Sequence, residues 1–452
     1  MAHVLISAAH KSSGKTVLSA GICAALHDKG LTVQTFKKGP DYIDPMWLSR
    51  ASHRNCYNLD FWTQTDREII SMFAKQVDGA DIGVVEANKG LHDGLSEDGR
   101  DSNAALARLL KAPVVLILDT RGTIRGVAPL VLGYQQFDPE IKIAGVILNF
   151  VGGDRHAAKL IRVMENYTDV PVVGTVYRND ELELVERYLG LKPSNEDLRA
   201  GSHIEKISKV VAEQVNLDRI EQIANSAPPV PNVEAPALVM SNCRLRIAYA
   251  CDEAFGFYYA DDLDTFSQLG VEMVPFDVLH DTSLPEADAL FLGGGFPEMN
   301  MHKLAANVSM KRAVREAVEH GMPAYAECGG LMYLCNSIKF KAVQCDMVGV
   351  IDADCEMHEK PIGRGYTVLQ KRPQHLWSGN IRHPVPGHEF HYSTLRDLAD
   401  YEYSYEVQRG FGVDGQFDGL RYKNLLACYS HQRNTQRNQW IPDFIEFIKS
   451  CS

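Results

Sequence analysis

Short apolar runs alternate with longer amphipathic stretches along most of the chain, and this alternation predicts the secondary structure. In the N-terminal half the predicted strands are Val4–Ala8, Thr32–Phe36, Ile82–Glu86, Val114–Leu118, Ala144–Asn149 and Val172–Gly174. In the C-terminal half they are Leu245–Ala250, Glu272–Phe276, Ala289–Leu292, Ala324–Glu327 and Leu425–Tyr429. Helical patterns such as Lys303–His320 lie between them. Several strands are almost continuously apolar, which is typical of strands covered by helices on both faces. Each half is therefore predicted to be an open parallel α/β sheet that binds ligands at the carboxyl ends of its strands.

A proline-rich segment separates the two halves. Four prolines lie between Ala224 and Pro236, and because proline lacks an amide donor and fixes φ, they predict an extended linker. The chain has 452 residues, which is too many for one hydrophobic core. We therefore expect a first domain at 1–225, the linker at 226–243 and a second domain at 244–452.

A phosphate-binding pattern follows the first predicted strand. Residues 9–16, Ala-His-Lys-Ser-Ser-Gly-Lys-Thr, match G-x-x-x-x-G-K-[ST] except that Ala9 replaces the first glycine. In this pattern backbone N–H groups cradle phosphate oxygens, the lysine neutralises their charge and the hydroxyl ligates Mg²⁺. A Ser/Gly turn that only caps a helix is the structural alternative. The predicted ATP-binding residues of this loop are Lys11, Ser12, Ser13, Gly14, Lys15 and Thr16.

Carboxylates at the ends of two predicted strands are placed to complete a magnesium site. Glu86 ends one strand, and Asp41 and Asp44 follow another. Magnesium prefers hard oxygen ligands together with substrate phosphates. The predicted metal ligands are Thr16, Asp41 and Glu86, whereas each acid taken alone is equally typical of a turn or a helix cap.

A second constellation lies in the C-terminal half. Residues 326–330, Ala-Glu-Cys-Gly-Gly, follow a short apolar strand and precede a helical pattern. Small residues on both sides of Cys328 allow a sharp strand-to-helix turn that exposes a nucleophile, and the helix dipole is expected to lower the pKa of the thiol. Another strand ends in the glycine run 293–295, so Gly294 and Gly329 are the predicted oxyanion donors.

A general base is also required beside the cysteine. His431 follows the last predicted strand, while His388 and His391 lie in a separate segment. Because functional side chains of parallel sheets gather past strand ends, the sequence favours His431 and keeps the other two as rivals.

Composition excludes several classes of protein. The net charge is −12 without a basic run, which argues against nucleic-acid or anionic-membrane partners. The longest apolar run, Ala112–Leu118, is far shorter than the roughly 18 residues of a membrane span. The ten cysteines are scattered without a C-x-x-C pair, so we expect reduced thiols in a cytoplasmic protein rather than a zinc ribbon.

Together these segments resemble the cobyrinic acid a,c-diamide synthases, amidotransferases that convert two acetate groups of a tetrapyrrole macrocycle into amides. The resemblance covers nearly the whole chain and rests on residues 10–16, 36–45, 58–60, 90–94, 252–259, 293–298, 327–330 and 387–393. The run Gly-Pro-Asp-Tyr-Ile-Asp-Pro at 39–45 and the order of the motifs are its most specific parts. The implied fold is a dethiobiotin-synthetase-like P-loop domain followed by a class I glutaminase-like domain.

The resemblance implies a reaction and a set of roles. ATP and Mg²⁺ would activate a carboxylate of a polycarboxylate tetrapyrrole as an acyl phosphate. Cys328 and His431 would release ammonia from glutamine, and the ammonia would pass between the domains. The position two residues beyond His431 is Arg433, so the resemblance implies a Cys–His pair without an acidic third member. Asn149 is similar to an adenine-contacting position. The residues expected to line the synthetase site, sharing metal and macrocycle contacts, are Asp41, Tyr42, Asp44, Glu86 and Asp93.

The chain departs from the family pattern beside the presumed macrocycle pocket. Asn88, Lys89 and His92 add polar or cationic groups where many members have apolar ones. This variant is similar to the branch that amidates sirohaem and is linked to dissimilatory sulfite reductase, so corrin and sirohaem-type substrates both stay open, as does a homodimer.

Two hypotheses of other classes remain. One is a partitioning-type ATPase switch, but His10 stands at the position of its signature lysine and a glutaminase half would have no purpose. The other is a binding protein with an inactive glutaminase half, which the presence of both Cys328 and His431 opposes.

Overall fold

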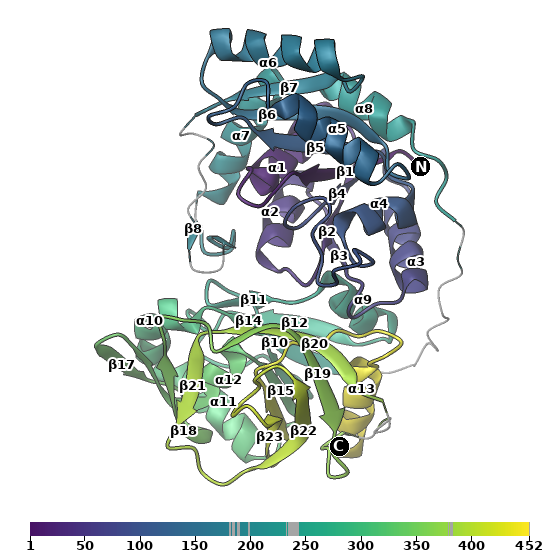
Figure 1. The fold of residues 1–452 in the computed structure, drawn as a ribbon. Coiled ribbons are helices and arrows are strands. Elements are labelled where there is room, and N and C mark those ends of the chain that lie inside the picture. Colours follow the sequence, from purple (N-terminus) through teal and green to yellow (C-terminus); the bar gives the residue numbers. More distant parts are fainter. Residues whose placement is uncertain are drawn as a thin grey trace. The chain divides into compact units, whose positions relative to one another are not determined.

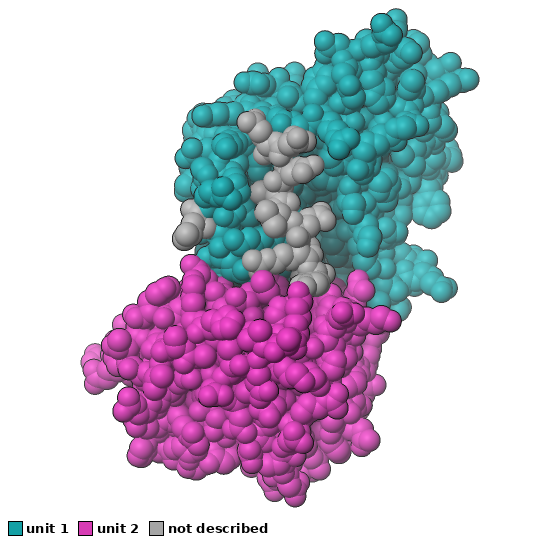
Figure 2. All heavy atoms as spheres, turned by 90° about the vertical axis from the view of Figure 1, so that its left-hand side faces the viewer, with its two compact units in different colours: residues 1–235 teal, residues 236–452 magenta. Residues whose placement is uncertain are grey.

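The computed structural model describes residues 1–179, 182, 186–187, 190–197, 199–231, 233, 244–377, 379 and 383–451. They belong to two compact units, 1–235 and 236–452 (Figure 2). The division falls inside the predicted linker, of which residues 232 and 234–243 lie outside the described residues. The precise domain limits stay a prediction.

The first unit contains a seven-stranded sheet in the order β3-β2-β4-β1-β5-β6-β7 (Figure 1). All of its neighbouring strands are parallel. Its strands are β1 (His3–Ala8), β2 (Val33–Lys38), β3 (Tyr57–Leu59), β4 (Ile82–Glu86), β5 (Val114–Asp119), β6 (Ile143–Val151) and β7 (Val172–Tyr177). The helices are α1 (Lys15–Asp28), α2 (Ile43–Ser52), α3 (Asp66–Val77), α4 (Asn103–Leu110), α5 (Val127–Phe137), α6 (Asp154–Tyr167), α7 (Ala200–Gln214) and α8 (Leu217–Asn225). A small antiparallel pair, β8 (Glu186–Arg187) and β9 (Gly190–Leu191), lies outside the sheet.

The predicted strands of this unit are found at their expected places. The side chains of β1 and β4 are buried along their whole length, because helices cover both faces of a parallel sheet. The short edge strand β3 was not predicted, and β7 continues to Tyr177, beyond the expected end at Gly174. With β1 between β4 and β5, the phosphate loop lies at the centre of the carboxyl edge.

The second unit has a nine-stranded mixed sheet in the order β12-β10-β13-β15-β24-β23-β22-β19-β20. Its parallel part is β12 (Glu272–Phe276), β10 (Arg246–Ala250), β13 (Ala289–Leu292), β15 (Ala324–Glu327) and β24 (Leu425–Cys428). Its antiparallel part is β23 (Phe417–Tyr422), β22 (Glu402–Arg409), β19 (Gly363–Lys371) and β20 (Val385–His391). Four further strands form a small sheet, β16 (Cys335–Phe340), β17 (Val343–Asp346), β18 (Ile351–Met357) and β21 (Ser393–Arg396). A short pair consists of β11 (Phe255–Phe257) and β14 (Gly294–Gly295).

The parallel part of this sheet confirms the predicted α/β class, whereas the antiparallel strands were not predicted. The helical elements are α9 (Ala260–Gln268), η2 (Pro297–Met299), α10 (Met301–Ala306), α11 (Val308–Glu319), α12 (Gly329–Leu334) and α13 (Trp440–Cys451). The helix predicted at Lys303–His320 is two helices. Asn307 separates them, because its side-chain oxygen accepts from Met310 N and caps α11 while its amide donates to the carbonyls of Val278 and Asp281.

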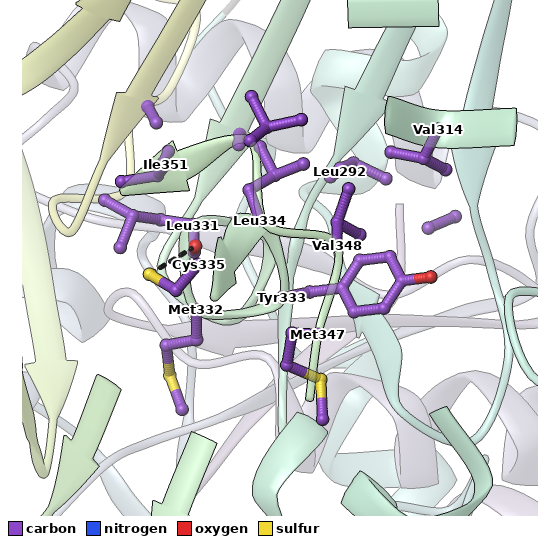
Figure 3. Close-up of a cluster of buried hydrophobic side chains, with 14 of the residues drawn as sticks. Leu292, Val314, Leu331, Met332, Tyr333, Leu334, Cys335, Met347, Val348 and Ile351 are labelled. Carbon is purple, nitrogen blue, oxygen red and sulfur yellow. Dashed lines mark hydrogen bonds between the residues drawn. The ribbon is translucent and has the colours of Figure 1, made fainter. Parts of the chain in front are cut away.

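Helix α12 is anchored in the core of the second unit. Leu331, Met332, Tyr333 and Leu334 are all buried, and Figure 3 shows them among Leu292, Val314, Met347, Val348 and Ile351. Fully burying one such side chain stabilises a fold by about 1.5–3 kcal/mol. A helix that is apolar on every side cannot rotate without exposing some of this surface, so the turn that precedes it is held in place.

Candidate active sites

The phosphate loop joins β1 to α1, and its backbone adopts conformations that suit an anion cradle. Ser12 and Gly14 both have positive φ, 62° and 83°. The Ser13 hydroxyl donates to the His10 carbonyl at 2.8 Å, which closes the loop. Such turns point successive N–H groups into one concavity at the start of a helix. Lys15 opens α1 and is largely buried.

Asn149, near the carboxyl end of β6, holds the phosphate loop in place through a hydrogen bond. Its side-chain nitrogen donates to the Ser13 carbonyl at 2.9 Å. A Cβ on Gly14 would lie 2.4 Å from the same nitrogen, so only glycine fits there. Asn149 also lines a cavity of about 150 Å³ together with Gly14, Val17, Leu18, Arg121, Phe150, Tyr177, Arg178, Asn179 and Leu182. The Arg121 guanidinium lies 4.4 Å from the centre of the Phe150 ring and forms an ion pair with Asp119, so the planar groups of Arg121 and Phe150 line the cavity beside the phosphate loop.

Two carboxylates converge on the Thr16 hydroxyl. Thr16 Oγ1 lies 2.8 Å from Glu86 Oε1 and 3.1 Å from Asp44 Oδ2, so the two carboxylates compete for its single hydroxyl proton. Lys37, at the end of β2, places its Nζ 2.7 Å from Glu86 and 2.5 Å from Asp44. Sequence reasoning missed Lys37, because a lysine in a strand gives no signal that it is buried; its side chain is only 3% exposed.

Burial controls the electrostatics of this cluster. It raises the pKa of Glu86, and the charge of Lys37 opposes that rise. Burial disfavours the Lys37 ammonium, but Asp44 and Glu86 outweigh it and raise the pKa of Lys37 above its usual range. Burial and the neighbouring Lys37 charge lower the pKa of Lys15 to about 8. Lys37 is therefore a permanent counter-charge, whereas Lys15 is held less firmly in its charged form.

The structure changes the assignment of the acids. Asp41 Oδ1 accepts from the backbone N–H groups of Ile43 and Asp44, at 2.9 and 3.1 Å, so Asp41 caps α2 while Asp44 faces Thr16. Burial and the charge of Asp44 raise the pKa of Asp41 to about 7. Tyr42 and Asp93 are the other two residues that the sequence predicts to bind substrate. Tyr42 is buried at the start of α2, and the exposed Asp93 accepts from Gly90 N at 3.0 Å.

The oxygen atoms around Thr16 fit a magnesium ion. Glu86 Oε2 is buried without a hydrogen-bond partner, which leaves it available as a hard oxygen ligand. Within the described ranges, no group of three or more His, Cys, Asp or Glu side chains forms a complete metal site. The donor set here is two carboxylates and one hydroxyl, so nucleotide phosphates would complete the coordination of Mg²⁺.

In the second unit, Cys328 occupies the turn between β15 and α12. Its backbone is strained, with φ 47° and ψ −99°. A Cβ on Gly330 would lie 2.1 Å from the Leu292 carbonyl oxygen, and one on Gly329 would lie 3.0 Å from Gly295 N. Strain of this kind is typical of nucleophiles presented at a strand-to-helix elbow. The two glycines are therefore required by close backbone approach.

The electrostatic expectation for the cysteine was wrong. The Cys328 side chain is almost fully buried, and this burial raises the pKa of its thiol. The negative charges of Glu298 and Glu327 add to the rise, and the Gly329 N–H opposes it. One short helix does not outweigh desolvation together with two acids. A thiolate here therefore depends on a partner that takes up the proton.

His431 lies beside the oxyanion candidates. It follows β24, which pairs in parallel with β15 so that Glu327 faces Cys428, and Cys328 N donates to the Cys428 carbonyl at 2.7 Å. A Cβ on Gly294 would lie 2.5 Å from His431 Cε1. The paired strand ends thus bring the neighbourhoods of Cys328, Gly294 and His431 together.

His431 also has an acidic neighbour that sequence reasoning missed. Its Nδ1 lies 3.4 Å from Glu327 Oε2. The position two residues after the histidine holds Arg433, which forms a buried ion pair with Asp261 at 3.0 Å. Parallel pairing of β15 with β24 was the signal that places residue 327 next to the histidine.

The two rival histidines have different surroundings. The His388 ring stacks on His431 at 4.9 Å, and its Nδ1 lies 3.2 Å from the Tyr259 hydroxyl. Burial, with the charges of His431 and Arg433, lowers the pKa of His388 well below its usual value. His391 instead stacks on Tyr429 at 3.9 Å. His388 therefore belongs to the cysteine site as a neutral ring.

Comparison with known proteins identifies both units. A CobQ/CobB/MinD/ParA nucleotide binding domain matches residues 5–191, and a CobB/CobQ-like glutamine amidotransferase domain matches residues 246–439. A nucleotide-binding P-loop domain followed by a glutamine amidotransferase domain defines a glutamine-dependent amide ligase. The chain is 40% identical over 451 residues to the cobyrinate a,c-diamide synthase of Magnetococcus marinus, covering 98% of this chain and 96% of that protein. It belongs to the cobyrinate a,c-diamide synthase family.

Two further relatives extend this similarity. The cobyrinate a,c-diamide synthase of Methanosarcina acetivorans is 38% identical, with 98% of this chain and 94% of that protein covered. The one from Listeria innocua is 40% identical, with 95% of this chain and 96% of that protein covered.

Among the described residues, no helix combines the length and apolar character that crossing a bilayer requires.

Proposed function

We propose that this enzyme amidates the a and c acetate carboxylates of a tetrapyrrole, with ATP as activator and glutamine as nitrogen donor. The observation that carries the proposal is the presence of two candidate sites in one chain of this family. One is a phosphate loop with acids on Thr16, and the other is a strained cysteine turn beside His431. Amide formation from a carboxylate needs both an activator and a source of ammonia.

In the first unit the chain's own groups would bind and orient the reactants. A carboxylate at neutral pH is a poor electrophile, and phosphorylation supplies a leaving group. Lys15 and the loop N–H groups would hold the transferred phosphoryl group in line with the substrate oxygen, and positioning with charge neutralisation supplies most of the catalysis in such transfers. Mg²⁺, held by Thr16, Asp44 and Glu86, would neutralise phosphate charge. Asn149 and the cavity beside it would hold the nucleobase.

In the second unit Cys328 would attack the side-chain amide of glutamine. His431 takes the thiol proton as the C–S bond forms and returns it to the departing ammonia. The N–H groups of Gly294 and Gly329 would stabilise the oxyanion. Water then hydrolyses the thioester to glutamate, and the ammonia attacks the acyl phosphate in the first unit.

The corrin cobyrinate is the first candidate substrate, since the relatives carry that name. A sirohaem-type macrocycle is the second candidate, because the Asn88–Lys89 variant is similar to the branch that amidates sirohaem. Of the three unusual residues in this segment, His92 packs edge-on against Tyr134 and Phe137, each at 4.9 Å, and the backbone N–H and carbonyl of Asn88 are hydrogen-bonded to the Asn103 side chain. Lys89 is exposed with φ 40°, so it presents a cation to a polycarboxylate ligand.

Incubation of the protein with each macrocycle, ATP, Mg²⁺ and glutamine tests this proposal. Mass spectrometry should show replacement of carboxyl OH by NH₂ at two positions of one macrocycle. If no candidate macrocycle is amidated, the substrate assignment is wrong. We also propose a cytoplasmic location, supported by the free thiols of all nine described cysteines.

A further inference from the structure

A buried carboxylate directly precedes the proposed nucleophile. Glu327 is the last residue of β15, and its Oε2 lies 3.4 Å from His431 Nδ1, with both side chains only 4% exposed. From this geometry, and on the basis of the roles proposed for Cys328 and His431, we propose that Glu327 is a positioning residue. It acts as the third member of the glutaminase relay, next to the nucleophile in sequence rather than after the histidine.

The Glu327 carboxylate is oriented by two hydrogen bonds. Its Oε1 accepts from the Tyr325 hydroxyl at 2.7 Å and from the Gln432 backbone N–H at 2.9 Å. Tyr325 and Glu327 are two residues apart and share one face of β15, as strand geometry requires. These bonds leave Oε2 directed at the imidazole. The carboxylate is thus held in one orientation before substrate binds.

The elbow separates the acid from the thiol. Adjacent side chains of a strand point to opposite faces. At Cys328 the strand also ends, because this residue has a positive φ of 47° and α12 begins directly after it. One strand end therefore supplies both a nucleophile and the group that braces its base. The neighbouring strand end, past β24, supplies the base itself.

A hydrogen-bond acceptor beside Nδ1 of His431 determines which ring nitrogen carries the proton. The 3.4 Å contact between Glu327 Oε2 and His431 Nδ1 is an ion-pair distance rather than a hydrogen bond. An ionised carboxylate only accepts hydrogen bonds, so closing this gap would favour the tautomer with its proton on Nδ1 and leave Nε2 free of a proton. That Nε2 is the atom that would take the thiol proton. When the imidazolium forms, the carboxylate also offsets its positive charge. Burial of Cys328 makes this help necessary, because the thiol does not ionise readily on its own.

The second position after His431 cannot supply the acid, because it is Arg433. Arg433 forms a two-point ion pair with Asp261, at 3.0 and 3.1 Å, and its guanidinium lies over the Tyr259 ring at 4.8 Å. This buried cation occupies the second position after His431. Pairing of β15 with β24 places Glu327 beside the histidine from the other strand, so the carboxylate reaches the ring by a different route.

The test is the variant Glu327→Gln in the full-length protein, with Glu389→Gln as a matched control. Glu389 is also buried and lies 3.7 Å from a histidine, His391. We measure synthesis with glutamine, synthesis with high ammonia, and the rate at which iodoacetamide alkylates Cys328. E327Q should lower the glutamine-dependent kcat on the order of a hundredfold, with KM for glutamine unchanged. It should also slow alkylation, because losing the partner of the base outweighs the loss of the Glu327 charge, which by itself disfavours the thiolate. Its ammonia-dependent synthesis should equal that of the wild type, and E389Q should leave the alkylation rate unchanged.

Two more variants make the outcome decisive. Glu327→Asp keeps the negative charge, so its kcat with glutamine as substrate should lie between those of E327Q and the wild type. Tyr325→Phe removes one orienting donor and should lower the glutamine-dependent kcat about fivefold, the effect of one hydrogen bond. If E327Q and Y325F both keep the wild-type rate with glutamine while Cys328→Ser loses it, the role of Glu327 is refuted and the proposed function stands. If C328S itself still uses glutamine, the proposed function fails.

Discussion

The two units place acids at equivalent points of their sheets but pair them with different cations. In the first unit Glu86, at the end of β4, contacts the ammonium of Lys37, which stays charged at every physiological pH. In the second unit Glu327, at the end of β15, faces the imidazole of His431. A permanent counter-charge suits a site that holds phosphates and a metal ion. A titratable one suits a site that moves a proton.

The largest expected effect is that of Cys328→Ser, which should separate ammonia release from amide synthesis. Cys328→Ser should lower glutamine-dependent synthesis by about 10⁴-fold, because the oxygen nucleophile lacks an equally matched base. Synthesis with high ammonia should continue at the wild-type rate. Parallel assays with the two nitrogen donors measure this, and an equal loss in both would contradict the division of labour between the units.

Lys15→Ala should impair synthesis with both nitrogen donors and spare the release of ammonia from glutamine. Removal of the ammonium that binds the phosphates should reduce synthesis about 10³-fold with either nitrogen donor. Release of glutamate from glutamine should remain measurable, since Cys328 and His431 are untouched. Unimpaired synthesis in K15A would remove Lys15 from the phosphate site.

The counter-charges should also differ in their effect on stability. Lys37→Met removes the cation that lies 2.7 Å from the buried Glu86 and 2.5 Å from the half-buried Asp44, and it should lower the free energy of unfolding by about 3–5 kcal/mol. His431→Gln, the matched change in the other unit, removes no permanent charge and should change stability far less. Denaturant unfolding measures both, and similar losses would show that the two pairs are electrostatically alike.

The smallest effect is a pH dependence of the second unit. Burial keeps the pKa of His388 below the value of about 6.5 that it has in the unfolded chain. The unfolded state therefore binds a proton that the folded state refuses, so stability is present above pH 6.5 and falls as the pH drops below it. One proton corresponds to about 1.4 kcal/mol per pH unit. His388→Gln should flatten the curve of unfolding free energy against pH between 6.5 and about 5.

Much of the fold was predictable because parallel strands are uniformly apolar. The ends of β4, β12, β13 and β15 agree with the predicted limits. The antiparallel strands of the second sheet carry no continuous apolar run; in β19, for example, Thr367, Leu369 and Lys371 are buried and alternate with half-buried residues. The break at Asn307 was missed because the amide caps one helix and donates to carbonyls distant in sequence.

The candidate sites were predictable only as far as local patterns extend. Gly14, Lys15, Cys328 and Gly329 belong to contiguous motifs whose backbone geometry follows from their spacing. Asp41 and Asp44 are three residues apart, and only the start of α2 decides which one faces Thr16. Contacts between strands, such as that of Glu327 with His431, require the order of the sheet and could not be read from spacing along one segment.

The left-handed backbone at residue 328 has a consequence for mutational scanning of this enzyme. Branched replacements such as valine or threonine at this corner should reduce the yield of folded protein, whereas glycine should be tolerated as an inactive but well-folded chain, because ψ −99° lies outside the αL region that asparagine also adopts. A library read out by protein abundance would therefore rank substitutions at this position by backbone tolerance, and one read out by growth would rank them by chemistry. Agreement between the two rankings would indicate that the corner is less rigid than its torsion angles require.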